Sequence, residues 1–423
     1  MDKKINFQGV RWVVLIFLFF ATVLLYIDRS ALGIMAPFLQ KEIGWSEQQY
    51  GNINTAFMVG YALCFLLMGH FVDKIGTRIG YAISLGMWAI AQASTAFAKN
   101  WLGFSFARFG LSIGQSGNFP VANKVVAEWF PKKERALAVG LFNGGSNVGT
   151  MISPLIIPVV VSAFNNNWQA AFIWTLPISA IWILSWLLFY KKPETHHLVS
   201  KKELEYINSD SQHETSEKIS WAVLLKRKEV WAICVGKLMT DPIWWFYLFW
   251  GAKFLNGKFG LNLKEIGLPF FTIYLFSWMG GIFIGWLSSK FLKMGWSLNK
   301  GRKMGFLACA IFALPVMFVP YVDHMWLAVG LIAVAAGGHC GWSANIFCLM
   351  SDIFPRKTTA SITGIGGFAG AVGGALIAQL VGGLLQNSGM DGYAIPFFIA
   401  SVGYFIALAI IQMLVPQIKS LNL

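Results

Sequence analysis

Charged side chains are scarce in this chain of 423 residues, at 12% against 56% hydrophobic residues. A chain with so few charges cannot keep most of its length in water. Its five cysteines lie in or beside apolar runs without the spacing of a metal site, so we expect reduced packing residues, no metal and no cofactor. A nucleophile paired with a base is also missing, because His196, His197 and His213 fall in a polar stretch. These absences argue against an enzyme.

Apolar runs long enough to cross a bilayer, which takes about 20 residues, recur along the whole chain. We predict twelve such spans, near 11–39, 47–71, 78–98, 100–127, 135–164, 168–190, 228–257, 264–290, 300–320, 323–350, 357–387 and 391–415. The first run is too long for a cleavable signal and lacks a small-residue cleavage site. The sequence therefore predicts an all-α polytopic membrane protein, with the lipid bilayer as its surroundings.

The net charge of +14 invites a nucleic-acid partner, but the basic residues follow the predicted topology instead. Most of the 33 Lys and Arg fall in segments on one side of the twelve spans. The exceptions on the other side are Lys41, Lys99, Lys253, Lys258 and Lys264. Such a split obeys the positive-inside rule. We therefore predict that both termini are cytoplasmic and that no nucleic acid binds.

One extended polar stretch divides the spans into two halves. We predict an N-terminal six-helix bundle at 1–190, a cytoplasmic linker at 191–227 and a C-terminal six-helix bundle at 228–423. The halves resemble each other, because Phe-Pro-Lys-Lys at 130–133 recurs as Phe-Pro-Arg-Lys at 354–357, and the same offset aligns Gly140 with Gly364. Duplicated halves with a binding site between them at mid-depth are one architecture of membrane transporters.

Asp28 and Arg29 stand side by side inside the first apolar run. A charge at the bilayer centre costs roughly 3 kcal/mol or more, so the pair needs a partner or a water-filled cavity. A mutually neutralising pair that fixes helix packing is one interpretation, and a substrate or ion pathway is the other, which we favour. Arg108 and Gln115 are seven residues apart in span four and share one helix face, from which Arg108 could neutralise Asp28.

The second half carries groups that suit a polyhydroxylated ligand, namely Trp245, Tyr247, His339, Trp342, Ser343 and Asn345. Taken alone, His339 could equally be a hydrogen-bonded packing histidine. Lys237 and Asp241 are one turn apart and are expected to neutralise each other. Because the Arg29 guanidinium gives bidentate bonds to a carboxylate, a sugar acid would satisfy both halves.

The loop at 69–78, between spans two and three, has a glycine–aspartate–basic pattern that resembles the signature of the major facilitator superfamily. That resemblance implies the major facilitator fold, with two six-helix bundles. Asp73 could meet a helix N-terminus or Arg135, whereas the corresponding loop of the second half has Ser289 where aspartate is expected. We predict gating roles at the cytoplasmic ends for Asp73, Arg78, Arg135, Lys124 and Glu128, the last two as a gate or an end-of-helix pair.

Longer motifs resemble the anion:cation symporter family of that superfamily. They are Tyr-Ile-Asp-Arg at 26–29, Ala-Arg-Phe at 107–109, Gly-x-Ser-Gly-Asn-Phe-Pro at 114–120 and Ala-Glu-Trp-Phe-Pro-Lys-Lys-Glu-Arg-Ala at 127–136. The run at 140–149 looks most like bacterial hexuronate transporters. The resemblance implies a monomeric symporter of the bacterial inner membrane that imports a sugar-acid anion with protons by alternating access. Alternatives are a galactonate or other organic-anion transporter, an uncoupled facilitator or antiporter, and a membrane sensor, although a sensor would need a larger soluble domain.

The resemblance also implies roles for single residues. Arg29 would hold the substrate carboxylate beside Tyr26 and Tyr61, and Asp28 would exchange the proton under the influence of Arg108. The remaining predicted substrate contacts are Gln115, Asn147, Trp245, Tyr247, His339, Trp342, Ser343 and Asn345.

Gln115 departs from the family pattern, which usually has a proton-coupling glutamate at this position. Glutamine cannot titrate, and it imitates the protonated acid in shape and donor pattern. Either Asp28 couples alone, or Gln115 is a substitution made to trap one state, which we favour. Both interpretations predict that substrate binds while proton-driven accumulation is impaired.

Overall fold

The computed structural model describes residues 9–209 and 221–421. In these ranges the chain is helical without any strand, and each of the twelve predicted spans coincides with one long helix or two consecutive ones. The long helices are α1 (Val10–Ile43), α2 (Glu47–Ile75), α3 (Thr77–Ser94), α6 (Lys132–Ala163), α11 (Lys228–Phe259), α12 (Gly267–Lys293), α14 (Met325–Ile353), α15 (Arg356–Ser388) and α16 (Ala394–Leu414). The predicted all-α fold is confirmed.

The other spans are built from consecutive helices. The fourth joins α4 (Trp101–Ser116) to α5 (Asn118–Trp129), the sixth joins α7 (Ala170–Ile173) to α8 (Thr175–Phe189), and the ninth joins α13 (Leu298–Ala313) to the 3-10 helix η3 (Leu314–Tyr321). In the described ranges, eight stretches are long and apolar enough to cross a membrane, and the last, Ser361–Leu414, includes all of α16 and most of α15. The chain is therefore a multi-pass membrane protein.

Tight connections hold successive helices antiparallel. Gly44 ends α1 in the left-handed conformation (φ 77°), which glycine adopts without strain. Two residues later, Ser46 and Gln49 form a capping box that begins α2. The same proline positions open the two repeated helices, because Pro131 caps α6 and Pro355 caps α15.

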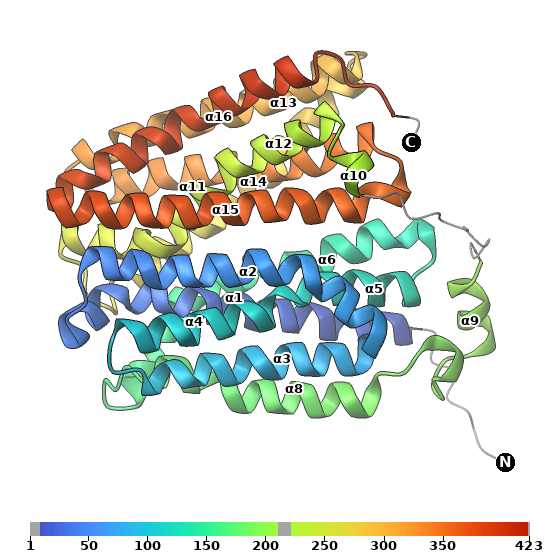
Figure 1. Cartoon of the computed structure of the whole chain (residues 1–423), viewed down its shortest axis with the longest axis horizontal. Coiled ribbons are helices and arrows are strands. Elements are labelled where there is room, and N and C mark those ends of the chain that lie inside the picture. Colours follow the sequence, from blue (N-terminus) through green and yellow to red (C-terminus); the bar gives the residue numbers. More distant parts are fainter. Residues whose placement is uncertain (1–8, 210–220, 422–423) are drawn as a thin grey trace.

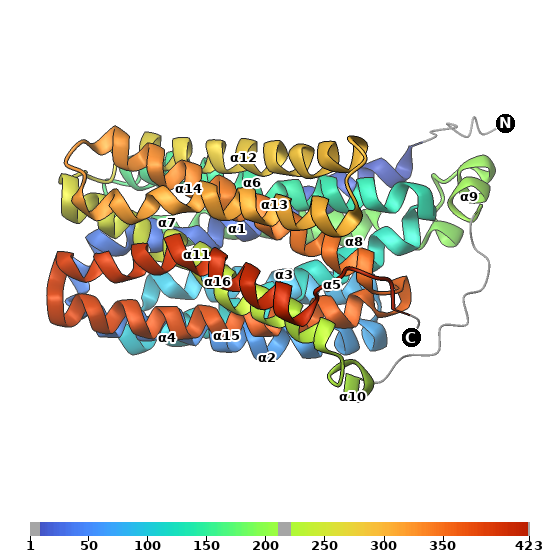
Figure 2. The same cartoon turned by 90° about the horizontal axis from the view of Figure 1, so that it is seen from above.

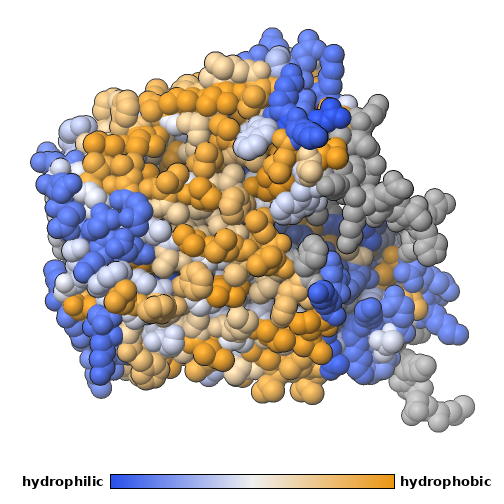
Figure 3. All heavy atoms as spheres, in the orientation of Figure 1, coloured by the Kyte–Doolittle hydropathy of each residue, from blue (hydrophilic) through white to orange (hydrophobic). Residues whose placement is uncertain are grey.

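The two halves of the chain lie on opposite sides of the assembly, with α1 to α8 in one layer and α11 to α16 in the other (Figure 1). We call the end that carries α9 (Lys201–Ile207) and α10 (Trp221–Leu224) the terminal end, and the opposite one the far end (Figures 1 and 2). On the face shown in Figure 3, an apolar band separates hydrophilic caps at the two ends. Its exposed apolar side chains suit contact with lipid.

Glycines bring helix backbones together. A Cβ on Gly145 or Gly149 of α6 would lie 2.6 Å and 2.5 Å from carbonyl oxygens of α1, so α6 can pack there only without a side chain. Between the halves, a Cβ on Gly51 of α2 would lie 2.7 Å from the carbonyl oxygen of Ala378 on α15. The α2–α15 seam runs between the two layers in Figure 1.

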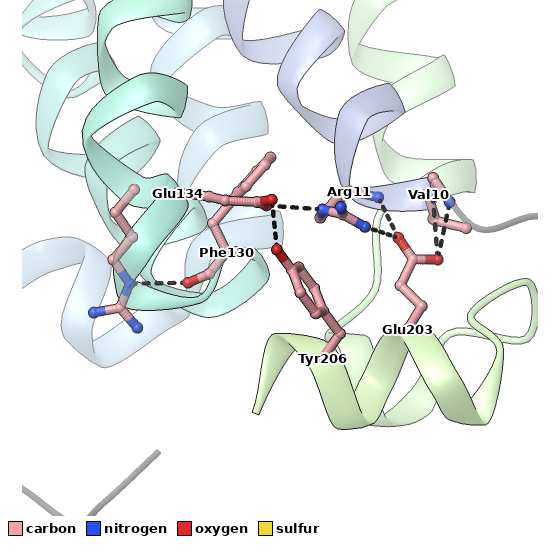
Figure 4. A network of polar contacts seen from close by, with 8 residues as sticks. Val10, Arg11, Phe130, Glu134, Glu203 and Tyr206 are labelled. Carbon is pink, nitrogen blue, oxygen red and sulfur yellow. Dashed lines mark hydrogen bonds and ion pairs between the residues drawn. The ribbon is translucent and has the colours of Figure 1, made fainter. Parts of the chain in front are cut away.

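Part of the predicted linker folds onto the first half. Glu203 of α9 accepts hydrogen bonds from the backbone N–H groups of Gly9, Val10 and Arg11, where α1 begins (Figure 4). The Arg11 guanidinium lies between Glu203 and Glu134 of α6, at 3.2 Å from each carboxylate. An anion at a helix N-terminus is favourable, so Glu203 anchors α9. The sequence analysis had assigned Glu203, with the rest of α9, to a plain cytoplasmic linker.

Candidate functional site

Arg29 lies in the middle of α1 and is only 1% exposed. Its guanidinium carbon lies 4.9 Å to 5.4 Å from the ring centres of Tyr26, Phe57, Tyr61 and Trp245. Three of these rings belong to the first half, and Trp245 comes from α11 of the second, so the cage spans both. Aromatic faces attract a cation but leave its N–H groups unbonded, and Nη2 has no hydrogen-bond partner. Arg29 thus keeps a donor for an anion.

Gln115 of α4 bridges Arg29 to the backbone of α1. Its Oε1 accepts a hydrogen bond from Arg29 Nε at 3.0 Å, and its Nε2 donates to the carbonyl oxygen of Leu25 at 3.1 Å. A carboxylic acid would reproduce both bonds only when protonated, because the second needs a donor. The structure therefore holds the arrangement that a protonated glutamate would adopt.

Asp28 points away from Arg29. It is fully buried; Oδ1 accepts a hydrogen bond from Thr175 of α8 at 2.7 Å, and Oδ2 has no partner. Among the described residues no ion pair joins it to Arg108, which instead donates to the carbonyl oxygen of Arg29 at 3.3 Å. Asp28 and Arg29 are thus not a pair; each faces different helices.

Trp245 and Tyr247 occupy opposite faces of α11. The Trp245 ring closes the cage around Arg29, whereas Tyr247 lines a small enclosed space with Phe270 and Tyr274 of α12. Two residues along a helix correspond to roughly 200°, so both side chains cannot reach one cavity. Of the two predicted contacts, the structure brings only Trp245 to Arg29.

The predicted polar residues of α14 also point in different directions. His339 stacks on Trp244 of α11, with ring centres 5.3 Å apart, and its Nδ1 hydrogen-bonds the hydroxyl of Tyr404 at 2.9 Å. Trp342 packs on Phe306 of α13 and on Tyr404, while Asn345 bonds within its own helix to the carbonyl oxygen of Gly341. Trp342 and Asn345 therefore face α13 and α16. The remaining predicted contacts, Ser343 on α14 and Asn147 on α6, are half-buried.

The residues predicted for gating lie together at the terminal end of the first half. Lys124 forms an ion pair with Asp73 at 2.7 Å, rather than a pair with Glu128. Glu128 instead accepts hydrogen bonds from Tyr190 and Thr77. The two arginines bond to carbonyl oxygens, Arg78 to Leu187 and Arg135 to Phe130 and Ala127. Asp73 contacts neither a helix N-terminus nor Arg135, the two predicted partners, and is paired with Lys124 instead.

At the far end, polar contacts join the two halves, and the sequence analysis missed them. Lys253 of α11 forms an ion pair with Glu47 of α2 at 2.5 Å and also donates to Gln40 of α1. Tyr50 donates to the carbonyl oxygen of Phe249 at 2.6 Å. Further bonds link α2 to Gln379 of α15. The partners in each of these contacts lie in segments far apart in the sequence, so only the fold reveals their proximity.

Comparison with known proteins assigns the chain to a family. The model of the Major Facilitator Superfamily matches residues 18–378. The chain belongs to the major facilitator superfamily. It is accordingly a transporter and not an enzyme, and the predicted fold and family are confirmed.

Relatives and solved structures agree with that assignment. The chain is 32% identical to the hexuronate transporter of Escherichia coli K12 over 390 residues, which cover 91% of this chain and 90% of the relative. It is 34% identical to the galacturonate transporter of Dickeya chrysanthemi, covering 68% and 84% of the two chains. In structure it is similar to a bacterial homologue of the human lysosomal transporter Spinster, at 16% identity and a TM-score of 0.80, with coverage of 96% and 97%. It is also similar to a D-xylose–proton symporter, at 14% identity and a TM-score of 0.75, with coverage of 97% and 99%.

Proposed function

We propose that this chain imports a sugar-acid anion, most specifically a hexuronate, across the bacterial inner membrane by alternating access. The observation that carries the proposal is the buried Arg29 guanidinium with an unbonded Nη2, enclosed by aromatic rings from both halves. A carboxylate is the ligand that this fork of donors recognises best. The names of the similar transporters supply the rest of the ligand, an oxidised sugar.

The contacts between the halves support the proposal of alternating access. The ion pair of Lys253 with Glu47 and the bond of Tyr50 to Phe249 hold the far end shut. With the basic loops at the terminal end facing the cytoplasm, these contacts close the outward side. Opening to the outside would separate α11 from α2 and would remove Trp245 from the Arg29 cage. Substrate entry from the outside and opening of the cage are therefore one motion in this proposal.

Proton coupling rests on Asp28 in this proposal, because Gln115 cannot titrate. A hexuronate of charge −1 needs a cation to enter against an inside-negative potential, at about 2.3 kcal/mol per charge per 100 mV. A second candidate function is exchange without net proton movement, and Gln115 is the observation that favours it. In that case one anion would leave for each anion that enters.

Counterflow in proteoliposomes tests the proposal. Vesicles loaded with unlabelled galacturonate should take up labelled galacturonate and glucuronate, and dicarboxylates should compete poorly. Arg29→Lys should lower uptake at least about tenfold, because an ammonium lacks the bidentate fork. The exposed residue Arg227 precedes α11, and Arg227→Lys is the matched control that should leave uptake unchanged. Uptake that survives in Arg29→Lys, or a wild type that ignores hexuronates, would reject the proposal.

A further inference from the structure

Lys237, Asp241 and Trp245 follow one another at four-residue intervals on α11 and so share one face of the helix. Trp245 at the end of this row covers Arg29. Lys237 Nζ lies 2.7 Å from Asp241 Oδ2, and the two side chains are 13% and 22% exposed. Unlike the fully buried Asp28, both side chains of this pair keep some exposed surface.

Three glycines of α15 match that row with the same spacing. A Cβ on Gly366 would lie 3.0 Å from Lys237, one on Gly370 would lie 2.1 Å from Asp241 Oδ2, and one on Gly374 would lie 2.9 Å from Trp245. All three nearest α11 atoms belong to side chains.

A different glycine of α15, Gly373, allows the close packing of α15 on α11. A Cβ on Gly373 would lie 2.4 Å from the carbonyl oxygen of Leu238, so Gly373 brings the backbones of α11 and α15 together. The row at Gly366, Gly370 and Gly374 instead leaves room on α15 for the three α11 side chains. The space above these glycines therefore positions the ion pair of Lys237 and Asp241.

The other polar side chains that we predicted as ligand contacts in the second half have partners away from Arg29. Tyr247 faces α12, Asn345 bonds within α14, and His339 bonds to Tyr404. Asp241, by contrast, shares its face of α11 with Trp245, which covers Arg29. Asp241 thus lies on the side of α11 that carries the Arg29 cage. It lies one helical turn, about 5.4 Å, from Trp245 towards the terminal end.

We propose that Asp241 is the hydroxyl-binding group of the second half, and that Lys237 is the positioning residue that orients its carboxylate. With the ligand's carboxylate at Arg29, the ring hydroxyls would donate hydrogen bonds to Asp241 beyond Trp245. A carboxylate is a strong acceptor for hydroxyl donors. This proposal rests on the proposed function and names the group that would distinguish a sugar acid from a plain carboxylate.

The test compares two ligands of the purified full chain in detergent. Galacturonate carries the hydroxyls, and tetrahydropyran-2-carboxylate has the same ring and carboxylate without them. Asp241→Ala should weaken galacturonate binding about 10- to 100-fold and leave the deoxygenated ligand within about twofold. The double variant with Lys237→Ala removes the unpaired ammonium and should give the same selective loss. Gly370→Ala should act in the same direction, because the added methyl displaces the Asp241 carboxylate.

The outcomes separate this inference from the proposed function. Wild type that binds neither ligand would contradict the transport proposal itself. Wild type that prefers galacturonate, together with Asp241 variants that keep the same preference ratio, would overturn the role of Asp241 alone. An equal loss of both ligands in the double variant would show a structural pair and would also overturn it. Only a selective loss of the galacturonate preference supports the proposal.

Discussion

Replacing Gln115 by glutamate should create pH-dependent binding at the Arg29 site. When protonated, the introduced carboxyl group reproduces both bonds of the glutamine, accepting from Arg29 Nε and donating to Leu25. When ionised, it keeps the first bond as an ion pair and loses the second. Arg29 is then neutralised, and a ligand carboxylate must compete for it. Gln115→Glu should therefore bind like wild type at low pH and more weakly as pH rises through the pKa of the introduced group.

The geometry sets the size of the effect. The amide oxygen that the carboxylate would replace lies 3.0 Å from Arg29 Nε. Two unit charges about 4 Å apart attract by about 4 kcal/mol at an effective dielectric constant of 20. Desolvation of the carboxylate and the lost bond to Leu25 offset part of this attraction. A net difference of about 1.5–3 kcal/mol, the usual worth of a hydrogen bond to a charged group, corresponds to a 10- to 150-fold change in affinity.

Binding titrations from pH 5 to pH 8 and uptake driven by an imposed pH gradient measure the two consequences. Gln115→Glu should accumulate substrate when the outside is acidic, and wild type should accumulate far less. Gln115→Met is the control, because it removes both hydrogen bonds without adding a titrating group and should bind more weakly at every pH. Strong gradient-driven uptake by wild type that does not rise in Gln115→Glu would refute this reasoning.

Other consequences concern coupling, the far-end contact and the linker. Asp28→Asn keeps an acceptor for Thr175, so counterflow should persist within about threefold while any gradient-driven uptake is lost. Lys253→Met breaks a partly buried, charge-assisted contact, which is worth about 1.5–3 kcal/mol, so spin labels at the far ends of α2 and α11 should report more open molecules. Exchanging Glu47 and Lys253 should restore closure. Glu203→Gln should lower the thermal unfolding temperature slightly, since a charge at a helix N-terminus is worth about 0.3–2 kcal/mol, with transport otherwise intact.

The fold was predictable from the sequence because lipid imposes its own rule. Every backbone group in the bilayer must bond internally, so each apolar run of sufficient length becomes a helix. Interruptions were not predicted: α4 and α5 meet at Gly117, within the polar stretch 115–118, which the sequence analysis kept inside a single span. The docking of α9 depends on Glu203 meeting the start of α1, which is a contact between segments far apart in the chain.

The site was partly predictable. Charges inside apolar runs identified Asp28, Arg29 and Arg108, because their cost in lipid is high wherever they lie. Side-chain direction was harder, since an aromatic or amide residue costs little on either face of a helix. Tyr247 was therefore assigned to a cavity that only Trp245 reaches. A face count along α11 would have separated the two residues.

The separation of Asp28 from Arg29 constrains how a proton could act on the ligand. Adjacent residues diverge by about 100° around an α-helix, so Asp28 faces Thr175 of α8 while Arg29 faces α2, α4 and α11. A proton on Asp28 cannot release Arg29 directly. We expect Arg108 to connect them, because this buried cation donates to the Arg29 carbonyl oxygen. Coupling through Asp28 therefore requires a movement of Arg108, whereas a carboxyl group at position 115 would act on Arg29 by direct contact.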